Sequence, residues 1–112
     1  MYFNIKTMAI DFNADLGEGY GNEAALMPFL DSCSIACGGH YGNAKSIESA
    51  LDLAWAHEVK VGAHPSYPDP LHFGRQSMSI PLKAFQAAIE KQLDLFFNSL
   101  EKKSMQCHHI KA

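Results

Sequence analysis

Short apolar runs along this chain alternate with longer stretches in which apolar residues recur at every third or fourth position. The short runs predict four strands, at residues 8–13, 34–37, 60–63 and 105–112. The periodic stretches predict three helices, at residues 22–30, 43–57 and 81–103. Strands that alternate with helices in this way are typical of parallel βαβ units, so we expect an α/β fold with four parallel strands.

Each of the two long predicted helices has one apolar face and a recognisable start. Asn43 is placed to cap the first of them, and Pro81 suits the first turn of the second. The apolar faces follow from three- and four-residue spacing. Their residues are Ile47, Ala50, Leu51, Ala54 and Trp55 in the first helix and Leu82, Phe85, Ile89, Leu93, Phe96 and Leu100 in the second.

Polar side chains follow three of the predicted strands. Asp15 lies after the first strand, in a turn that contains three glycines, while His40 and His64 follow the second and third strands. Right-handed crossovers bring the carboxyl ends of parallel strands to one rim of the sheet, where barrel enzymes carry their active sites. We therefore expect Asp15, His40 and His64 to converge on one rim.

One carboxylate and two imidazoles form a suitable ligand set for a divalent ion such as zinc, manganese or iron. Such an ion would polarise a carbonyl group or activate a water molecule. Without a metal, Asp15, His40 and His64 would serve as general acids and bases. The alternative is structural, with His40 capping a glycine turn and His64 held by Pro65 to shape the loop. Two histidines at equivalent strand ends favour the functional interpretation.

Further candidate residues lie near the same strand ends. Glu18, in the glycine turn, is a second candidate acid or base. Lys111, near the end of the last strand, is placed to bind an anionic group or stabilise an oxyanion. Asn13 and Arg75 are candidate substrate-binding residues, the arginine through a carboxylate. Arg75 belongs to a loop at residues 66–79, and loops of this length inside a compact domain are usually functional.

The composition narrows the class of protein. The 112 residues carry a net charge of −3 and are 47% hydrophobic, as in a globular domain, and they contain no basic stripe that would bind nucleic acid. No apolar run approaches the roughly 20 residues that span a membrane. The first residues lack the apolar segment of a secretory signal, which predicts a cytoplasmic protein.

The cysteines Cys33, Cys37 and Cys107 show no spacing typical of a disulfide framework, so we predict free thiols. Buried thiols of this kind behave as small apolar side chains. A metal site built from Cys33, Cys37 and His40 is a weaker alternative, because the usual Cys-x-x-Cys pair is absent.

Four motifs in this chain resemble those of the LamB/YcsF family, the A subunit of bacterial 5-oxoprolinase. They are NADLGEG at residues 13–19, IACGGH at residues 35–40, GAHPSYPD at residues 62–69 and FGR at residues 73–75. Their order and spacing match the family over essentially the whole chain. The resemblance implies ATP-dependent opening of the 5-oxoproline lactam to L-glutamate, in a complex with two other subunits, B and C.

The resemblance also implies a fold, a TIM-like (β/α) barrel related to polysaccharide deacetylases and glycoside hydrolases. Family members are about twice as long as this chain, so residues 1–112 are expected to form a single partial domain, the N-terminal half of such a barrel. The related barrels leave a metal-dependent carbohydrate deacetylase or hydrolase as one alternative function. An inactive fragment that only binds partner subunits is another.

The chain departs from the family pattern in its length, described above, and at one residue of the second motif. Family members usually carry phenylalanine where this chain has Gly39, which is expected to loosen the turn before His40. The resemblance implies a complex that uses ATP, but these residues contain no Gly-x-x-x-x-Gly-Lys-Ser/Thr loop. The sequence therefore does not locate an ATP site.

Overall fold

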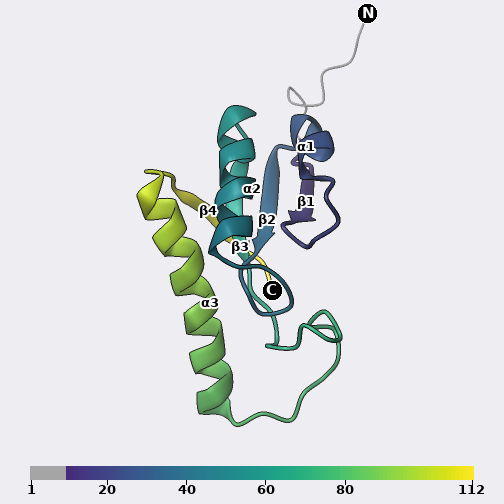
Figure 1. Cartoon of the computed structure of the whole chain (residues 1–112), viewed down its shortest axis with the longest axis vertical. Helices are drawn as coiled ribbons and strands as arrows, with labels where there is room; N and C mark the ends of the chain where they lie inside the picture. Colours follow the sequence, from purple (N-terminus) through teal and green to yellow (C-terminus); the bar gives the residue numbers. More distant parts are fainter. Residues whose placement is uncertain (1–9) are drawn as a thin grey trace, which may run out of the picture.

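Four parallel strands form the centre of the computed structural model, which describes residues 10–112 (Figure 1). They lie in sequence order, and each strand pairs with the next. Their bounds are Asn13–Leu16 for β1, Ser32–Ala36 for β2, Lys60–His64 for β3 and Cys107–Ile110 for β4. The predicted α/β fold with four parallel strands is confirmed. Within the described residues no further strand pairs with the outer edge of β1 or β4, so the sheet is open, as in half of a barrel.

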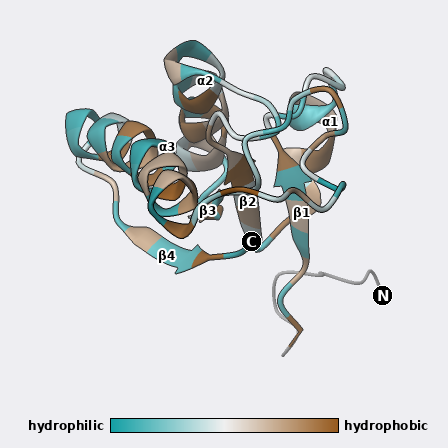
Figure 2. Ribbon diagram, turned by 90° about the horizontal axis from the view of Figure 1, so that it is seen from below, coloured by the Kyte–Doolittle hydropathy of each residue, from teal (hydrophilic) through white to brown (hydrophobic). Residues whose placement is uncertain are grey.

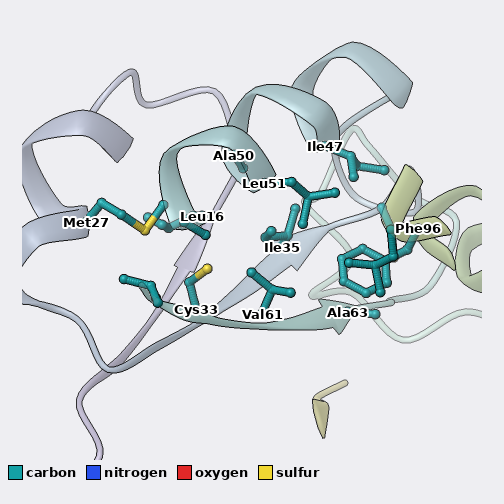
Figure 3. Close-up of a cluster of buried hydrophobic side chains, with 14 of the residues drawn as sticks. Leu16, Met27, Cys33, Ile35, Ile47, Ala50, Leu51, Val61, Ala63 and Phe96 are labelled. Atoms are coloured by element: carbon teal, nitrogen blue, oxygen red, sulfur yellow. The ribbon is translucent and has the colours of Figure 1, made fainter. Parts of the chain in front are cut away.

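The helices lie on one side of this sheet (Figure 2). Their bounds are Glu23–Leu26 for α1, Met27–Phe29 for the 3₁₀ helix η2, Ala44–Ala56 for α2 and Leu82–Lys102 for α3. Burial of apolar surface between helices and strands holds the two layers together. The buried core, drawn in part in Figure 3, consists of Leu16, Met27, Leu30, Cys33, Ile35, Cys37, Ile47, Ala50, Leu51, Ala54, Val59, Val61, Ala63, Phe96 and Leu100.

The predicted cap of α2 is confirmed. The Asn43 side-chain oxygen accepts a hydrogen bond from the Ser46 backbone N–H at 2.9 Å, and the Ser46 hydroxyl accepts one from the Asn43 N–H at the same distance. This reciprocal pair satisfies two donors that would otherwise stay unpaired at the start of the helix. It also anchors the end of the loop that carries His40.

Two residues of the predicted apolar faces are exposed. Trp55 is 70% exposed, because it lies about 80° around α2 from Ile47, at the edge of the buried face. Leu82 is 77% exposed, because the first turns of α3 extend beyond the strands (Figure 1), while Phe96 and Leu100 are buried. These two residues of the predicted apolar faces therefore lie outside the buried core.

The first strand begins later than predicted. The predicted strand covered residues 8–13, of which the first two lie outside the described part of the chain, whereas β1 begins at Asn13. Side chains alternate along β1, with Ala14 and Leu16 packed toward the core and Asp15 on the other side. β1 is thus a half-buried strand, whereas the strand predicted at residues 8–13 was mostly apolar.

The predicted helix at residues 22–30 is divided into two short elements. α1 ends at Leu26, and η2 follows as a single 3₁₀ turn that contains Pro28. Proline has no backbone N–H to continue the hydrogen-bond pattern of an α-helix, which accounts for the change. The other elements differ from their predicted bounds by at most two residues at either end.

The face of the sheet opposite the helices carries mainly polar side chains, and we call it the open face. In a closed (β/α) barrel this face usually carries bulky apolar residues, so a polar lining is unusual. The residues of the open face are Asn13, Asp15, Ser32, Ser34, Gly62, His64 and His109.

None of the described helices combines the length and apolar character needed to span a bilayer.

Candidate active site

One cavity of about 450 Å³ gathers most of the candidate residues at the carboxyl ends of the strands. Asn13 is not among its lining residues; it lies on the open face, where its amide donates a hydrogen bond to Ser32. A substrate-binding role for Asn13 therefore stays a prediction. The candidates that line the cavity are Asp15, Glu18, His40, His64, Arg75 and Lys111.

Strand ends and glycine turns deliver the side chains to this cavity. His64 is the last residue of β3. His40 follows β2 by four residues, after a turn in which Gly38 adopts a φ of 106°. Glu18 follows β1 directly after Gly17, whose φ is 71°. These left-handed conformations, which glycine adopts without strain, turn each loop back over the end of its strand.

Asp15 reaches the cavity from within β1, and not from the turn beyond it as predicted. Its two carboxylate oxygens lie 2.9 and 2.7 Å from Lys111 Nζ. The pair joins the first strand of the sheet to the residue that follows the last strand, with β2 and β3 lying between them. It also leaves Asp15 Oδ2 3.5 Å from His64 Nε2.

Glu18, His40 and His64 form the tightest group in the cavity. Glu18 Oε2 lies 2.5 Å from His40 Nε2 and 3.8 Å from His64 Nε2. One ligand atom from each of the three residues lies within 4.8 Å of the others. The geometry favours Glu18 as the carboxylate of a metal site, whereas Asp15 is paired with Lys111. A metal-binding role for Asp15 stays a prediction.

Hydrogen bonds on the far side of each ring fix which nitrogen faces the cavity. His64 Nδ1 lies 3.0 Å from the Lys111 backbone carbonyl, which can only accept, so Nδ1 carries the proton. His40 Nδ1 lies 2.9 Å from Ser66 Oγ. That hydroxyl donates to the Tyr67 carbonyl at 3.0 Å, so His40 Nδ1 is the donor in the first contact. When the rings are neutral, both Nε2 atoms therefore present a lone pair to the cavity.

A positive ion is needed between these lone pairs and the carboxylate of Glu18. A proton on His40 is one solution, but burial of its ring lowers the pKa, and the hydrogen bond that His40 donates to Glu18 offsets this only in part. A divalent metal is the other solution, and two imidazole nitrogens with one carboxylate oxygen suit zinc. Metal–ligand bonds of about 2.0–2.2 Å place ligand atoms roughly 3–3.6 Å apart. The residues present fit a divalent metal with only small shifts.

Phe73 covers this group from the long loop. Its ring centroid lies 4.9 Å from that of His40, in edge-to-face geometry. Phe73 and Gly74 both have positive φ, of 58° and 70°, and a Cβ on Gly74 would lie 3.1 Å from His40 Cβ. The close approach and the left-handed backbone explain the glycine. Arg75 follows with its guanidinium carbon 5.9 Å from the Phe73 ring centroid.

Comparison with known proteins identifies the family. Residues 10–112 match the sequence model of the LamB/YcsF family. This chain belongs to the LamB/YcsF family. It is similar to the crystal structure of the lactam utilization protein from Thermus thermophilus, with 36% sequence identity and a TM-score of 0.85. The similarity covers 92% of this chain and 44% of that chain, so this chain spans less than half the length of the solved protein.

Ser66 and Gln92 support the site of this LamB/YcsF chain, and the sequence did not single them out. Ser66 contacts His40, and Gln92, buried on α3, holds the backbone of Ser66. A signal existed for Gln92, which lies three residues after Ile89 and four before Phe96, on the apolar face of its helix. A polar side chain there needs buried partners. Nothing in the pattern distinguishes Ser66 from other loop serines.

The turn at Gly39 is packed, in contrast to the looser turn that was expected in place of the family's phenylalanine. Gly39 is buried, and its φ lies outside the left-handed region. A Cβ at this position would lie 2.4 Å from Gln92 Oε1, so the side-chain amide occupies the adjacent space. The glycine therefore leaves room for a neighbouring side chain.

The cysteines are free thiols, as predicted, with Cys33 and Cys37 buried and Cys107 partly buried. Burial raises the pKa of Cys33 to about 12 and that of Cys37 to about 11, so both stay protonated at neutral pH. Metals bind the thiolate form. The metal-suited group in the described part of the chain contains neither cysteine, which leaves the weaker alternative site without support.

A second polar group lies on the open face. His109 Nε2 lies 2.8 Å from Ser34 Oγ, which donates to Asn13 Oδ1 at 3.2 Å. Asn13 Nδ2 donates to Ser32 Oγ at 2.8 Å, and Ser32 Oγ donates to Asp11 Oδ1 at 2.7 Å. Because the single hydroxyl proton of Ser34 is directed to Asn13, His109 Nε2 is the donor in its contact with Ser34. Burial, and then a neighbouring histidine, lower the pKa of His109, which keeps the ring neutral.

Proposed function

We propose that this chain carries reaction-centre residues of a lactam-opening enzyme, the A subunit of an ATP-dependent 5-oxoprolinase. The whole enzyme would open the lactam of 5-oxoproline and release L-glutamate. The complex would hydrolyse ATP and include two further subunits, B and C, in the cytoplasm. Membership of the LamB/YcsF family and the likeness to a protein named for lactam utilization support this proposal.

The group of Glu18, His40 and His64 at the cavity is the observation that carries the proposal. An amide resists attack until its carbonyl is polarised and its nitrogen can accept a proton. A divalent metal bound by these three residues would polarise that carbonyl or lower the pKa of a water molecule. The fixed Nδ1–H groups of both histidines keep Nε2 available as a ligand.

Other residues of the cavity fit the remaining requirements of the reaction. Asp15, close to His64, accepts a proton from the attacking water. Lys111 supplies positive charge for the developing oxyanion. Arg75 binds the carboxylate of the substrate through its planar guanidinium. If no metal is bound and a proton lies between Glu18 and His40 instead, Glu18 acts as the acid or base.

A metal-dependent carbohydrate deacetylase or hydrolase is the second candidate. The same carboxylate and imidazoles would suit the hydrolysis of an acetyl group. The half-barrel fold does not choose between the two reactions, because one fold hosts many chemistries. An inactive chain that only binds partner subunits is the third candidate.

The decisive experiment compares products. The full-length protein that carries these residues is mixed with the B and C subunits of its own organism, 5-oxoproline and ATP, and glutamate release is measured against ADP formation. We expect glutamate in step with ADP. His64→Ala should lower the rate by about 10²-fold or more, which is the usual contribution of a positioned acid, base or ligand.

His72→Ala is the matched control, because His72 is half-exposed and its Nδ1 lies 2.9 Å from Asp69 Oδ2, away from the cluster. Undiminished release with His64→Ala would remove His64 from the mechanism. Acetate released from an acetylated sugar, with no glutamate, would replace the proposal with the deacetylase. Binding of the B and C subunits with neither product would favour the partner-binding chain.

A further inference from the structure

Gln92 is a buried polar residue whose amide faces the backbone of the active-site loop. It lies on α3 and is 4% exposed. Its Oε1 accepts a hydrogen bond from the Ser66 N–H at 3.0 Å, and its Nε2 donates to the Ser66 carbonyl at 2.9 Å. The side-chain amide thus pairs with both backbone groups of one residue, much as a neighbouring strand would. Both ends of the buried amide are satisfied, which fixes its place.

Ser66 passes this restraint to His40. Its hydroxyl lies 2.9 Å from His40 Nδ1 and is directed by its own donation to the Tyr67 carbonyl. With the Ser66 backbone held from α3, the hydroxyl stays where the imidazole needs it. His40 then presents Nε2 to Glu18. Histidines that bind metals generally depend on such a partner at the other ring nitrogen.

The place of Gln92 depends on the absence of a side chain at Gly39. A Cβ there would lie 2.4 Å from Oε1 and 2.7 Å from both Cδ and Nε2 of Gln92. These are the three heavy atoms nearest to that Cβ. The φ of Gly39 lies outside the left-handed region, so its backbone accepts alanine. The glycine at position 39 therefore leaves the space that the Gln92 amide occupies.

We propose that Gln92 is a positioning residue for His40, acting through Ser66 in the space that Gly39 leaves open. The device couples three separate segments, the loop after β2, the loop after β3 and the middle of α3. This proposal rests on the proposed function in one respect, which is that His40 binds a metal. The orientation of the His40 ring is measurable without any metal.

Gln92→Met tests the proposal by removing the amide while keeping the length and bulk of the side chain. We expect the affinity of the full chain for zinc alone, measured by calorimetry, to fall on the order of ten- to a hundredfold. The ¹⁵N resonances of the His40 ring should shift toward those of mixed tautomers. Gln86→Met is the matched control on the same helix, because Gln86 is exposed and contacts Glu90. It should change neither measurement.

Gly39→Ala tests the same coupling from the other side. Its methyl group displaces the Gln92 amide, so it should reproduce the loss seen with Gln92→Met. In a Gln92→Ala background the same substitution meets open space and should change zinc affinity by less than about twofold. Equal losses from Gly39→Ala in the two backgrounds would overturn the coupling.

Two outcomes separate this inference from the proposed function. If the unmodified chain does not bind zinc, the metal-dependent part of the proposed function fails, and the His40 resonances alone decide on Gln92. If Gln92→Met does not fold, Ser66→Ala replaces it, because it keeps both backbone groups that Gln92 holds. A folded variant with unchanged His40 resonances and unchanged zinc affinity would overturn the inference.

Discussion

The two faces of the sheet differ in character, although the same strands form both. Toward the helices, positions such as Ile35 and Val61 are apolar and buried. On the open face, neighbouring positions such as Asp15, Ser34 and His64 make ion pairs and hydrogen bonds. Because consecutive residues of a strand point to opposite faces, core residues and polar residues of the open face alternate along each strand. Substitutions on the helix side should therefore lower the free energy of unfolding most, and those on the open face should lower it less and alter the polar contacts.

The largest effect is expected on the side of the helices. Phe96→Ala removes a fully buried ring from α3 and should lower the free energy of unfolding by about 3–5 kcal/mol, measured by urea denaturation. Phe97→Ala is the control, since Phe97 is next in the helix and 41% exposed, and its loss should be clearly smaller. Equal losses would show that the core does not favour one face of α3.

An intermediate effect is expected on the open face at Gly62. A Cβ there would lie 2.4 Å from His109 Nε2, so alanine would push the ring away from Ser34, its partner at 2.8 Å. Gly62→Ala should lower the free energy of unfolding by about 1–2 kcal/mol, the value of a lost, partly buried hydrogen bond. In a His109→Ala background the same change should cost little. Equal costs in both backgrounds, by the same urea measurement, would rule out the ring as the obstacle.

At neutral pH the smallest effect concerns the thiols of Cys33 and Cys37, whose ionisation changes stability only at high pH. Burial raises their pKa values from 9.0 to about 12 and about 11. Above pH 9 the unfolded chain releases protons that the folded chain retains, so stability is unaffected below pH 9 and falls as the pH rises toward 11 to 12. Urea denaturation of the chain and of Cys33→Ala across this range measures the fall. Identical pH profiles would contradict the burial of Cys33.

Local sequence was enough to predict the features that depend on nearby residues. Asn43 caps α2 because its partner Ser46 is three residues away. The alternation of strands and helices, together with the handedness of their connections, was enough to bring His40 and His64 to one rim. These predictions did not require knowing which side chains are in contact in the folded protein.

The rest depends on contacts between residues far apart in the chain. Glu18 meets His40 across 22 residues, and Ser66 meets Gln92 across 26. A sequence pattern shows that such residues are polar but not which partners they find. The first strand was predicted too early in the chain for a related reason. The prediction followed the apolar run, whereas β1 forms where alternating residues around Asp15 pair with β2.

Lys111 is tied to β3 through both of its backbone groups. Its N–H donates to the Ala63 carbonyl at 2.9 Å, and its carbonyl accepts from His64 Nδ1 at 3.0 Å. Lys111 follows directly on β4, the edge strand of the described sheet. Any polypeptide that docks beside β4 and shifts it would thus tilt the imidazole of His64 as well. Closing the sheet and reorienting the His64 ring would then be a single event.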